Sequence, residues 1–221
     1  MVKQDTYKRL GKQHKIIIIY PGYNGTMEGY NGKYNTIAEI LNKKYNFNVV
    51  QSSNMCGQEA NYSSDVQNWL RHLIINELCE WEYVRPIEIY LMGVSAGASA
   101  CAMVAYEFPE VTKMLLIAPS TDAIDGDDGE SVQDIYKAIL QYKGHLYVTV
   151  GEQDEIVGNA FPRLLSDCAT NAIANKFVEV PNCDHQFRGE TNGKIFSKSP
   201  LWAFCDDNTY PSPEGGIKLY D

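Results

Sequence analysis

Short apolar runs of strand length alternate with longer amphipathic segments along the 221-residue chain. This alternation is typical of a parallel sheet whose strands are joined by crossover helices. The near-continuous apolar content of runs such as KIIIIY suits strands that are buried on both faces. Six strands are predicted, at 15–20, 47–52, 87–93, 113–118, 145–150 and 177–180.

Two segments carry the periodicity of amphipathic helices. In the segment 64–81, apolar residues such as Val66, Leu70 and Leu73 recur at steps of three and four, which gathers them into one stripe. The segment 132–141 shows the same spacing. Both are predicted to cover the sheet.

The fold class that follows is α/β: a three-layer sandwich with a mostly parallel central sheet of about six strands and helices on both faces. No repeat or long linker interrupts the pattern, and a chain of 221 residues can bury a sizeable core, so a single domain over 1–221 is expected. Residues from about 208 to 221 combine prolines and glycines with few apolar side chains, which indicates an extended tail.

Charge and cysteine usage exclude several classes of function. The formal net charge of −9 argues against nucleic acid and anionic membranes as partners, because both require clustered Lys and Arg. The longest apolar run is only strand-sized, and no export signal is expected. Six dispersed cysteines without a C-x-x-C pair indicate reduced thiols in the cytoplasm. Cys183 and His185 lie close together, but no further pair stands at zinc-site spacing, so no metal is expected.

The sequence Gly93-Val94-Ser95-Ala96-Gly97 follows an apolar strand and precedes a segment rich in small residues. This is the G-x-S-x-G pattern, in which the serine occupies a sharp turn between a strand and a helix. Glycines flank the serine because a Cβ at either position would clash with neighbouring backbone. The pattern predicts Ser95 as a nucleophile. The alternative is a glycine-rich turn with an incidental serine.

A serine hydroxyl is a weak nucleophile at neutral pH, so the hypothesis requires a histidine base. The chain has four histidines. His14 precedes the first predicted strand, His72 lies inside an amphipathic helix, and His145 opens a strand, which indicates structural or surface positions. His185 lies in a polar loop after the last predicted strand and is the predicted base.

The histidine in turn requires a group that fixes its tautomer. The predicted strand 145–150 is followed at once by a loop that contains Asp154, which is the predicted partner. Glu152 and Glu155 are nearby carboxylates that could take this role after a small shift of the loop. Asp184, beside the histidine, is a further candidate.

Backbone N–H groups must meet the oxyanion that forms when a serine attacks an acyl group. One is expected from Ala96, directly after the nucleophile. The other is expected from the loop at 20–25, where Tyr23 and Asn24 are candidates and Tyr23 is favoured. The alternative is a simple turn, since proline–glycine and asparagine–glycine pairs are turn signals.

From about residue 15 to about 205 the chain resembles the α/β-hydrolase family. The GVSAG elbow, the G-x-x-D-x-x-V segment at 151–157 and the position of His185 match the family's motifs in order and location. Two features depart from the family's pattern. Pro21-Gly22 stands where the family often has His-Gly, and only fourteen residues precede the first predicted strand, so the usual antiparallel N-terminal hairpin is not expected.

The resemblance implies a serine hydrolase that cleaves carboxylic esters through an acyl-enzyme intermediate and needs no cofactor. In the family a cap is commonly inserted where this chain has the segment between Ser120 and Ser131, which is too short for a cap domain. We therefore expect an open site for small or accessible ester-type substrates. A peptidase, amidase or thioesterase would use the same groups, and a non-catalytic ligand-binding protein on the same fold is a further alternative.

Two further loops belong to the expected rim of the site. Five acidic residues within 122–130 are interpreted as a solvated rim, with a Ca²⁺ site as the alternative. The loop at 52–64 and the aromatic residues Tyr23, Tyr30 and Tyr62 are candidates for lining the pocket, because ligands bind beyond the carboxyl ends of parallel strands.

Overall fold

The structure is a computed structural model that describes residues 4–54, 62–81, 86–121, 132–205 and 218–220. The strands in these ranges are β1 (Thr6–Arg9), β2 (Lys15–Tyr20), β3 (Asn48–Ser52), β4 (Glu88–Val94), β5 (Val111–Ile117), β6 (His145–Gly151), β7 (Ala174–Val180) and β8 (Lys218–Tyr220). The helices are α1 (Lys33–Tyr45), α2 (Tyr62–Glu80), α3 (Ala96–Val104), α4 (Val132–Gln141), α5 (Ala160–Cys168) and α6 (Glu190–Phe204), with short 3₁₀ turns η1 (Tyr30–Gly32) and η2 (Ala105–Glu107).

The strands of the described chain form one sheet in the order β1-β3-β2-β4-β5-β6-β7-β8. The six predicted strands are β2 to β7, and they pair in parallel from β3 across to β7. Two short strands that the sequence did not predict extend the sheet, because β1 and β8 pair antiparallel at its two edges. The expected mostly parallel α/β sheet is confirmed. In place of an N-terminal hairpin stands the single strand β1.

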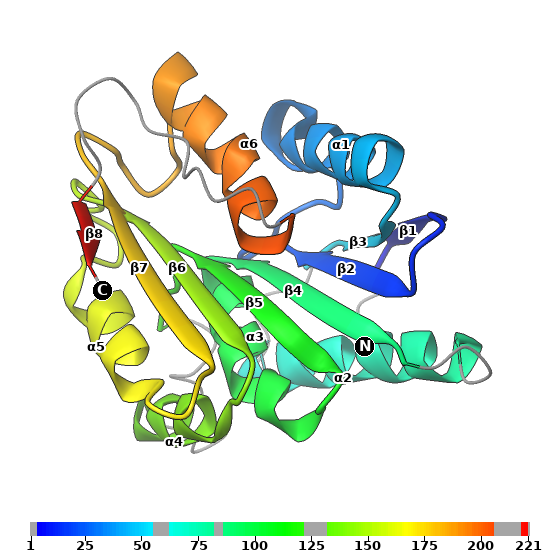
Figure 1. The fold of residues 1–221 in the computed structure, drawn as a ribbon. Helices are drawn as coiled ribbons and strands as arrows, with labels where there is room; N and C mark the ends of the chain where they lie inside the picture. The colour runs from blue at the N-terminus through cyan, green and yellow to red at the C-terminus, as the bar shows by residue number, and fades with distance from the viewer. Residues whose placement is uncertain (1–3, 55–61, 82–85, 122–131, 206–217, 221) are drawn as a thin grey trace.

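Helices cover both faces of this sheet (Figure 1). α1 and α6 lie together on one face, and α2, α3, α4 and α5 cover the other. Strand β2 shows why continuous apolar runs were required: Ile17 and Ile19 pack with α1 and α6, whereas Ile16 and Ile18 pack with the helices of the opposite face. The two segments with helical periodicity form α2 and α4, as predicted.

Further predictions concern the C-terminal tail, two loops, membrane spans and the cysteines. Within the C-terminal tail, residues 218–220 form β8, and the remainder of 206–221 lies outside the described residues. The acidic loop 122–130 and residues 55–61 also lie outside them. Among the residues that the structure describes, no helix combines the length and apolar content needed to cross a bilayer. The five cysteines of the described chain, which exclude Cys56, are all free thiols.

The parallel strands place four loops at the same edge of the sheet. Ser95 follows β4, Asp154 follows β6, and His185 lies in the loop after β7. The loop that contains Tyr23 follows β2. Because β2, β4, β6 and β7 run in the same direction, their carboxyl ends bring these loops together above the sheet.

Candidate active site

Ser95 occupies a strained turn between β4 and α3. Its backbone has φ 53° and ψ −123°, a conformation that residues with a side chain rarely adopt. The Ser95 N–H donates to the carbonyl oxygen of Ile117 at 2.8 Å, which holds the turn against the end of β5. Its neighbours Val94 and Ala96 are buried while Ser95 itself is partly exposed, so the turn presents one hydroxyl at the surface of a rigid support.

The glycines on either side of the serine are required by close backbone contacts, as the sequence indicated. A Cβ at Gly93 would lie 2.5 Å from the Cα of Ala98. A Cβ at Gly97 would lie 2.2 Å from the carbonyl oxygen of Pro21. These distances are far below an ordinary van der Waals contact. Glycine at 93 therefore lets α3 turn back close to β4, and glycine at 97 lets the elbow approach the loop after β2.

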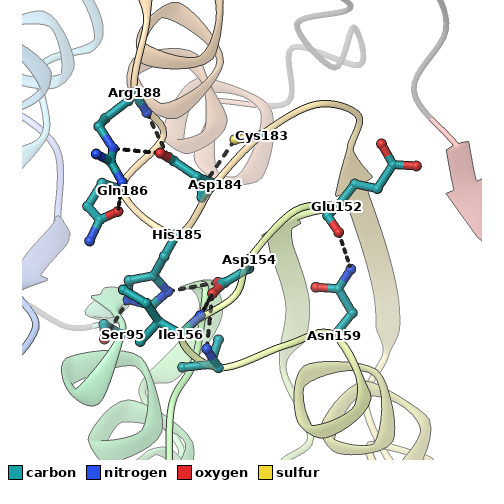
Figure 2. Close-up of polar contacts among 11 residues, drawn as sticks. Ser95, Glu152, Asp154, Ile156, Asn159, Cys183, Asp184, His185, Gln186 and Arg188 are labelled. Carbon is teal, nitrogen blue, oxygen red and sulfur yellow. Dashed lines mark hydrogen bonds and ion pairs between the residues drawn. The ribbon is translucent and has the colours of Figure 1, made fainter.

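His185 bridges Ser95 and Asp154 (Figure 2). Its Nε2 lies 3.1 Å from the Ser95 Oγ, and its Nδ1 lies 2.7 Å from the Asp154 Oδ2. The imidazole is only 12% exposed. In the neutral tautomer with the proton on Nδ1, the ring donates to the carboxylate and accepts from the serine hydroxyl, which is the arrangement a general base requires.

Asp154 is fixed by its own loop. Its Oδ1 accepts hydrogen bonds from the backbone N–H groups of Ile156 and Val157, each at 3.0 Å, which leaves Oδ2 for His185 (Figure 2). The carboxylate is fully buried. Charge-assisted hydrogen bonds of this kind offset the cost of burying the charge and fix the direction of the carboxylate.

The other carboxylates considered from the sequence have different surroundings. Glu152 is exposed and accepts a hydrogen bond from the Asn182 N–H at 3.0 Å, and Glu155 is exposed. Asp184 pairs with the Arg188 Nε at 2.6 Å (Figure 2). Of the four candidates, Asp154 is the one that the structure places on His185.

The loops after β6 and β7 are tied together beneath the histidine. Backbone hydrogen bonds join the Gln153 N–H to the Cys183 carbonyl and the Glu152 N–H to the Val180 carbonyl, both at 2.8 Å.

Burial, with the charges of nearby aspartates, raises the pKa of the Cys183 thiol to about 12, so this cysteine stays protonated at neutral pH. Within the described chain, no group of three His, Cys, Asp or Glu residues is placed to hold a metal ion.

The loop after β2 lies directly against the elbow. A Cβ at Gly22 would lie 2.9 Å from the Ser95 Cβ and 3.5 Å from its Oγ, so the backbone leading into Tyr23 passes beside the nucleophile. Asn54 holds this loop from β3, because its Nδ2 donates to the Pro21 carbonyl at 3.1 Å and its N–H donates to the Gly25 carbonyl at 2.8 Å. This loop was expected to supply the Tyr23 N–H to the oxyanion, with a simple turn as the alternative, and no sequence motif singled out Asn54.

A hollow of about 450 Å³ opens above Ser95 and His185. Tyr23, Tyr30 and Lys33 are among its lining residues, so two of the three predicted aromatic residues lie there. The side chain of Tyr62 is outside the described part of the structure. Lys33 was not found by sequence reasoning, since a lysine at the start of a helix carries no motif.

No protein-family model matches the chain, and no curated protein matches it. Solved structures do resemble it. A monoacylglycerol lipase from Paleococcus ferrophilus has a TM-score of 0.66 at 14% identity, covering 90% of this chain and 97% of that one. A dienelactone hydrolase from Anabaena variabilis has a TM-score of 0.65 at 17% identity, covering 93% and 92%.

Est1E from Butyrivibrio proteoclasticus has a TM-score of 0.64 at 15% identity, covering 89% of this chain and 90% of that one. The similarity to all three proteins thus extends over nearly the full length of both chains. It agrees with the sheet order, the helices on both faces and the strand-to-helix turn at Ser95. The chain has the α/β-hydrolase fold.

Proposed function

We propose that the protein is a serine hydrolase that cleaves carboxylic esters of small or accessible substrates through an acyl-enzyme intermediate. The observation that carries this proposal is the continuous hydrogen-bonded chain from Asp154 through His185 to Ser95, with the serine in a strained turn beneath an open hollow. Three residues far apart in the sequence meet in the arrangement that activates a serine hydroxyl.

In the first half of the reaction, the Ser95 Oγ attacks the ester carbonyl carbon and His185 Nε2 takes the hydroxyl proton. The imidazolium that forms is stabilised by Asp154, whose carboxylate is already aligned with Nδ1. The tetrahedral intermediate then collapses: the bond to the alcohol oxygen breaks, His185 returns the proton to that oxygen, and the alcohol leaves. The acyl group remains on Ser95.

In the second half, a water molecule attacks the acyl-enzyme while His185 accepts its proton. Collapse of the second intermediate breaks the bond to Ser95, returns the proton to its oxygen and releases the carboxylic acid. In both halves the negative oxygen is met by the backbone N–H groups of Ala96 and Tyr23 in our proposal. The closeness of Gly22 to Ser95 supports the role of this loop, since the peptide leading into Tyr23 lies beside the nucleophile.

The proposed substrate class rests on the openness of the hollow and on the proteins that share the fold. The hollow over Ser95 is bordered by exposed aromatic residues, with Tyr30 83% exposed. Similar structures include an esterase domain from Rhodothermus marinus, a lipase and a dienelactone hydrolase, and Est1E has been solved with ferulic acid bound. The proposed chemistry uses side chains and backbone alone, without a cofactor. The free cysteines support a proposed cytoplasmic location.

Covalent labelling tests the nucleophile without knowledge of the substrate. A fluorophosphonate reacts with an activated serine and forms a stable phosphonyl adduct. We expect one adduct on the wild-type protein, located on Ser95 by peptide mass spectrometry, and none on a folded Ser95→Ala variant. If the folded wild-type protein stays unlabelled, Ser95 is not activated and a ligand-binding role on the same fold replaces the proposal.

A further inference from the structure

A second hollow adjoins the one over Ser95 and lies between the start of α1 and the start of α6. Its volume is about 880 Å³, and Tyr30, Lys33 and Gln186 line both hollows. Figure 1 shows the two helices next to each other on the same face of the sheet. The two hollows are therefore neighbours that share Lys33 at their border, and the region from Ser95 past Lys33 to the larger hollow is called the path below.

The charges along this path are opposite in sign to those of the whole protein. The chain carries a formal net charge of −9. Yet the described residues that line the two hollows include Lys33 and Arg188 and contain no Asp or Glu. Arg188 is engaged by Asp184, so its charge is largely compensated. Lys33 also lines both hollows, and no carboxylate of the described residues forms an ion pair with it.

The surroundings of Lys33 are apolar and aromatic. Its Nζ lies 4.1 Å from the ring centroid of Phe196 and 5.2 Å from that of Tyr34. No carboxylate of the described residues forms an ion pair with it, and burial lowers the pKa of its ammonium group below the usual range. Aromatic rings attract a cation only weakly compared with a carboxylate in the same partly buried position.

The start of α1 adds to the positive potential. The helix has no acidic residue in its first turn. Its first two backbone N–H groups are already bonded, that of Lys33 to the Tyr30 carbonyl and that of Tyr34 to the Glu28 carbonyl at 2.9 Å. The helix end therefore adds only its dipole to the positive potential of the lysine ammonium.

We propose that Lys33 forms a subsite for an anionic group, of which a carboxylate is the simplest, carried by the ester that Ser95 attacks. The inference rests on the proposed function and narrows its substrate class to esters that bear a negative charge on the acyl or the alcohol side. Taking an ammonium group partly out of water is costly without a countercharge, and in our proposal the substrate supplies it. The rings of Phe196 and Tyr34 hold the ammonium in place until the anion arrives.

Two matched pairs of esters test the subsite and show which side of the ester bears the charge. Monomethyl adipate differs from methyl hexanoate only in a carboxylate that replaces the terminal methyl group. The anion 4-acetoxybutanoate differs in the same way from butyl acetate. We expect the wild-type protein to prefer the anionic member of one pair by about tenfold or more in kcat/KM, the effect of one charge-assisted hydrogen bond.

The variants isolate the charge of Lys33. In Lys33→Met the preference should fall close to one, and Lys33→Arg should restore most of it. Lys43→Met is the matched control, because Lys43 lies on the same helix, outside both hollows, and pairs with Glu39 at the surface. A wild-type protein that cleaves both members of each pair equally well would overturn the anionic subsite and leave the proposed hydrolase intact. A preference for the anionic ester that persists in Lys33→Met would also overturn the anionic subsite.

Binding to an inactive variant separates the subsite from the proposed chemistry. Calorimetry with 4-acetoxybutanoate and monomethyl adipate on Ser95→Ala should give at least one Kd that weakens about tenfold when Lys33→Met is added. If the wild-type protein cleaves none of the four esters but this dependence is seen, the hydrolase proposal fails and the anion site stands. If neither anionic ester binds in a way that depends on Lys33, the anion site fails.

Discussion

The backbone of Ser95 stores strain that a glycine in its place would not. Holding a residue with a Cβ at φ 53° and ψ −123° lowers the free energy of unfolding by on the order of 1–3 kcal/mol, whereas glycine adopts such angles without a steric penalty. We therefore predict that Ser95→Gly is more stable than Ser95→Ala by about 1 kcal/mol, after the larger chain entropy of glycine is subtracted. Urea unfolding of the two variants measures the difference. Equal stabilities would mean that the turn is relaxed in the folded protein.

Asp154 is predicted to act through the tautomer of His185. In Asp154→Asn the side-chain oxygen can still accept from the Ile156 and Val157 N–H groups, so the loop should keep its shape. The amide that replaces Oδ2 donates instead of accepting, which favours the wrong tautomer of the imidazole. We expect kcat for a simple ester to fall about a thousandfold or more with little change in KM.

Asp184→Asn is the control for that substitution. Asp184 lies next to His185 in sequence, but its carboxylate pairs with Arg188 on the outside of the loop. Its activity should stay within about threefold of the wild type, because an exposed ion pair contributes little to the position of the loop. Similar losses in both aspartate variants would show that negative charge near the histidine matters, and not the specific contact of Asp154.

At the scale of elements, the loop after β2 depends on a side chain from the neighbouring strand. Asn54 follows β3, and its side-chain amide donates to the Pro21 carbonyl, whereas its backbone N–H, which alanine would keep, donates to the Gly25 carbonyl. We predict that Asn54→Ala lowers kcat about tenfold, because the Tyr23 N–H is then less well held where the oxyanion forms. If Asn54→Ala only weakened the fold, the free energy of unfolding and the amount of active protein would fall, but kcat per labelled Ser95 site would not. Measuring kcat against fluorophosphonate-titrated sites distinguishes the two.

The central strands and the helices α2 and α4 were predictable because each carries a signal of its own. β2, β4 and β6 are buried almost throughout and are largely apolar, whereas β3 and β7 each carry a shorter apolar run between polar residues. α2 and α4 repeat apolar residues every three to four positions, a signal that the sequence analysis did not find in α1, α5 and α6. The edge strands lack such a signal. β1 is the partly exposed sequence TYKR, and β8 has three residues, so pairing with a neighbour decides their conformation.

The candidate site could be predicted only where a residue follows the end of a strand. Ser95, Asp154 and His185 were singled out because the turn motif and the strand ends limit their positions, and they stay proposed site residues. Asn54 and Lys33 were missed because their contacts, with the loop after β2 and with Phe196 of α6, join segments distant in sequence. Nothing in their local sequence marks such contacts.

At the scale of the whole molecule, the sheet gathers the site from segments spread over most of the chain. We propose that residues 1–221 form a single domain, and the continuous sheet from β1 to β8 supports it. Ser95 and His185 are 90 residues apart in sequence, yet their side chains are hydrogen-bonded. The net charge of −9 leaves the protein acidic as a whole, so Lys33 beside the hollow over Ser95 is a local positive feature, which we propose selects anionic esters.

The most direct test of the proposed hydrolase is the release of p-nitrophenol from a short-chain acyl ester by the wild-type protein, Ser95→Ala, His185→Ala and the double variant. Circular dichroism should first show that all four are folded. We expect each single variant to lose about 10⁴-fold or more in kcat/KM, and the double variant to lose little more, because the two residues act as a unit. A wild-type rate no higher than that of the variants would contradict the assignment of Ser95 and His185 as nucleophile and base.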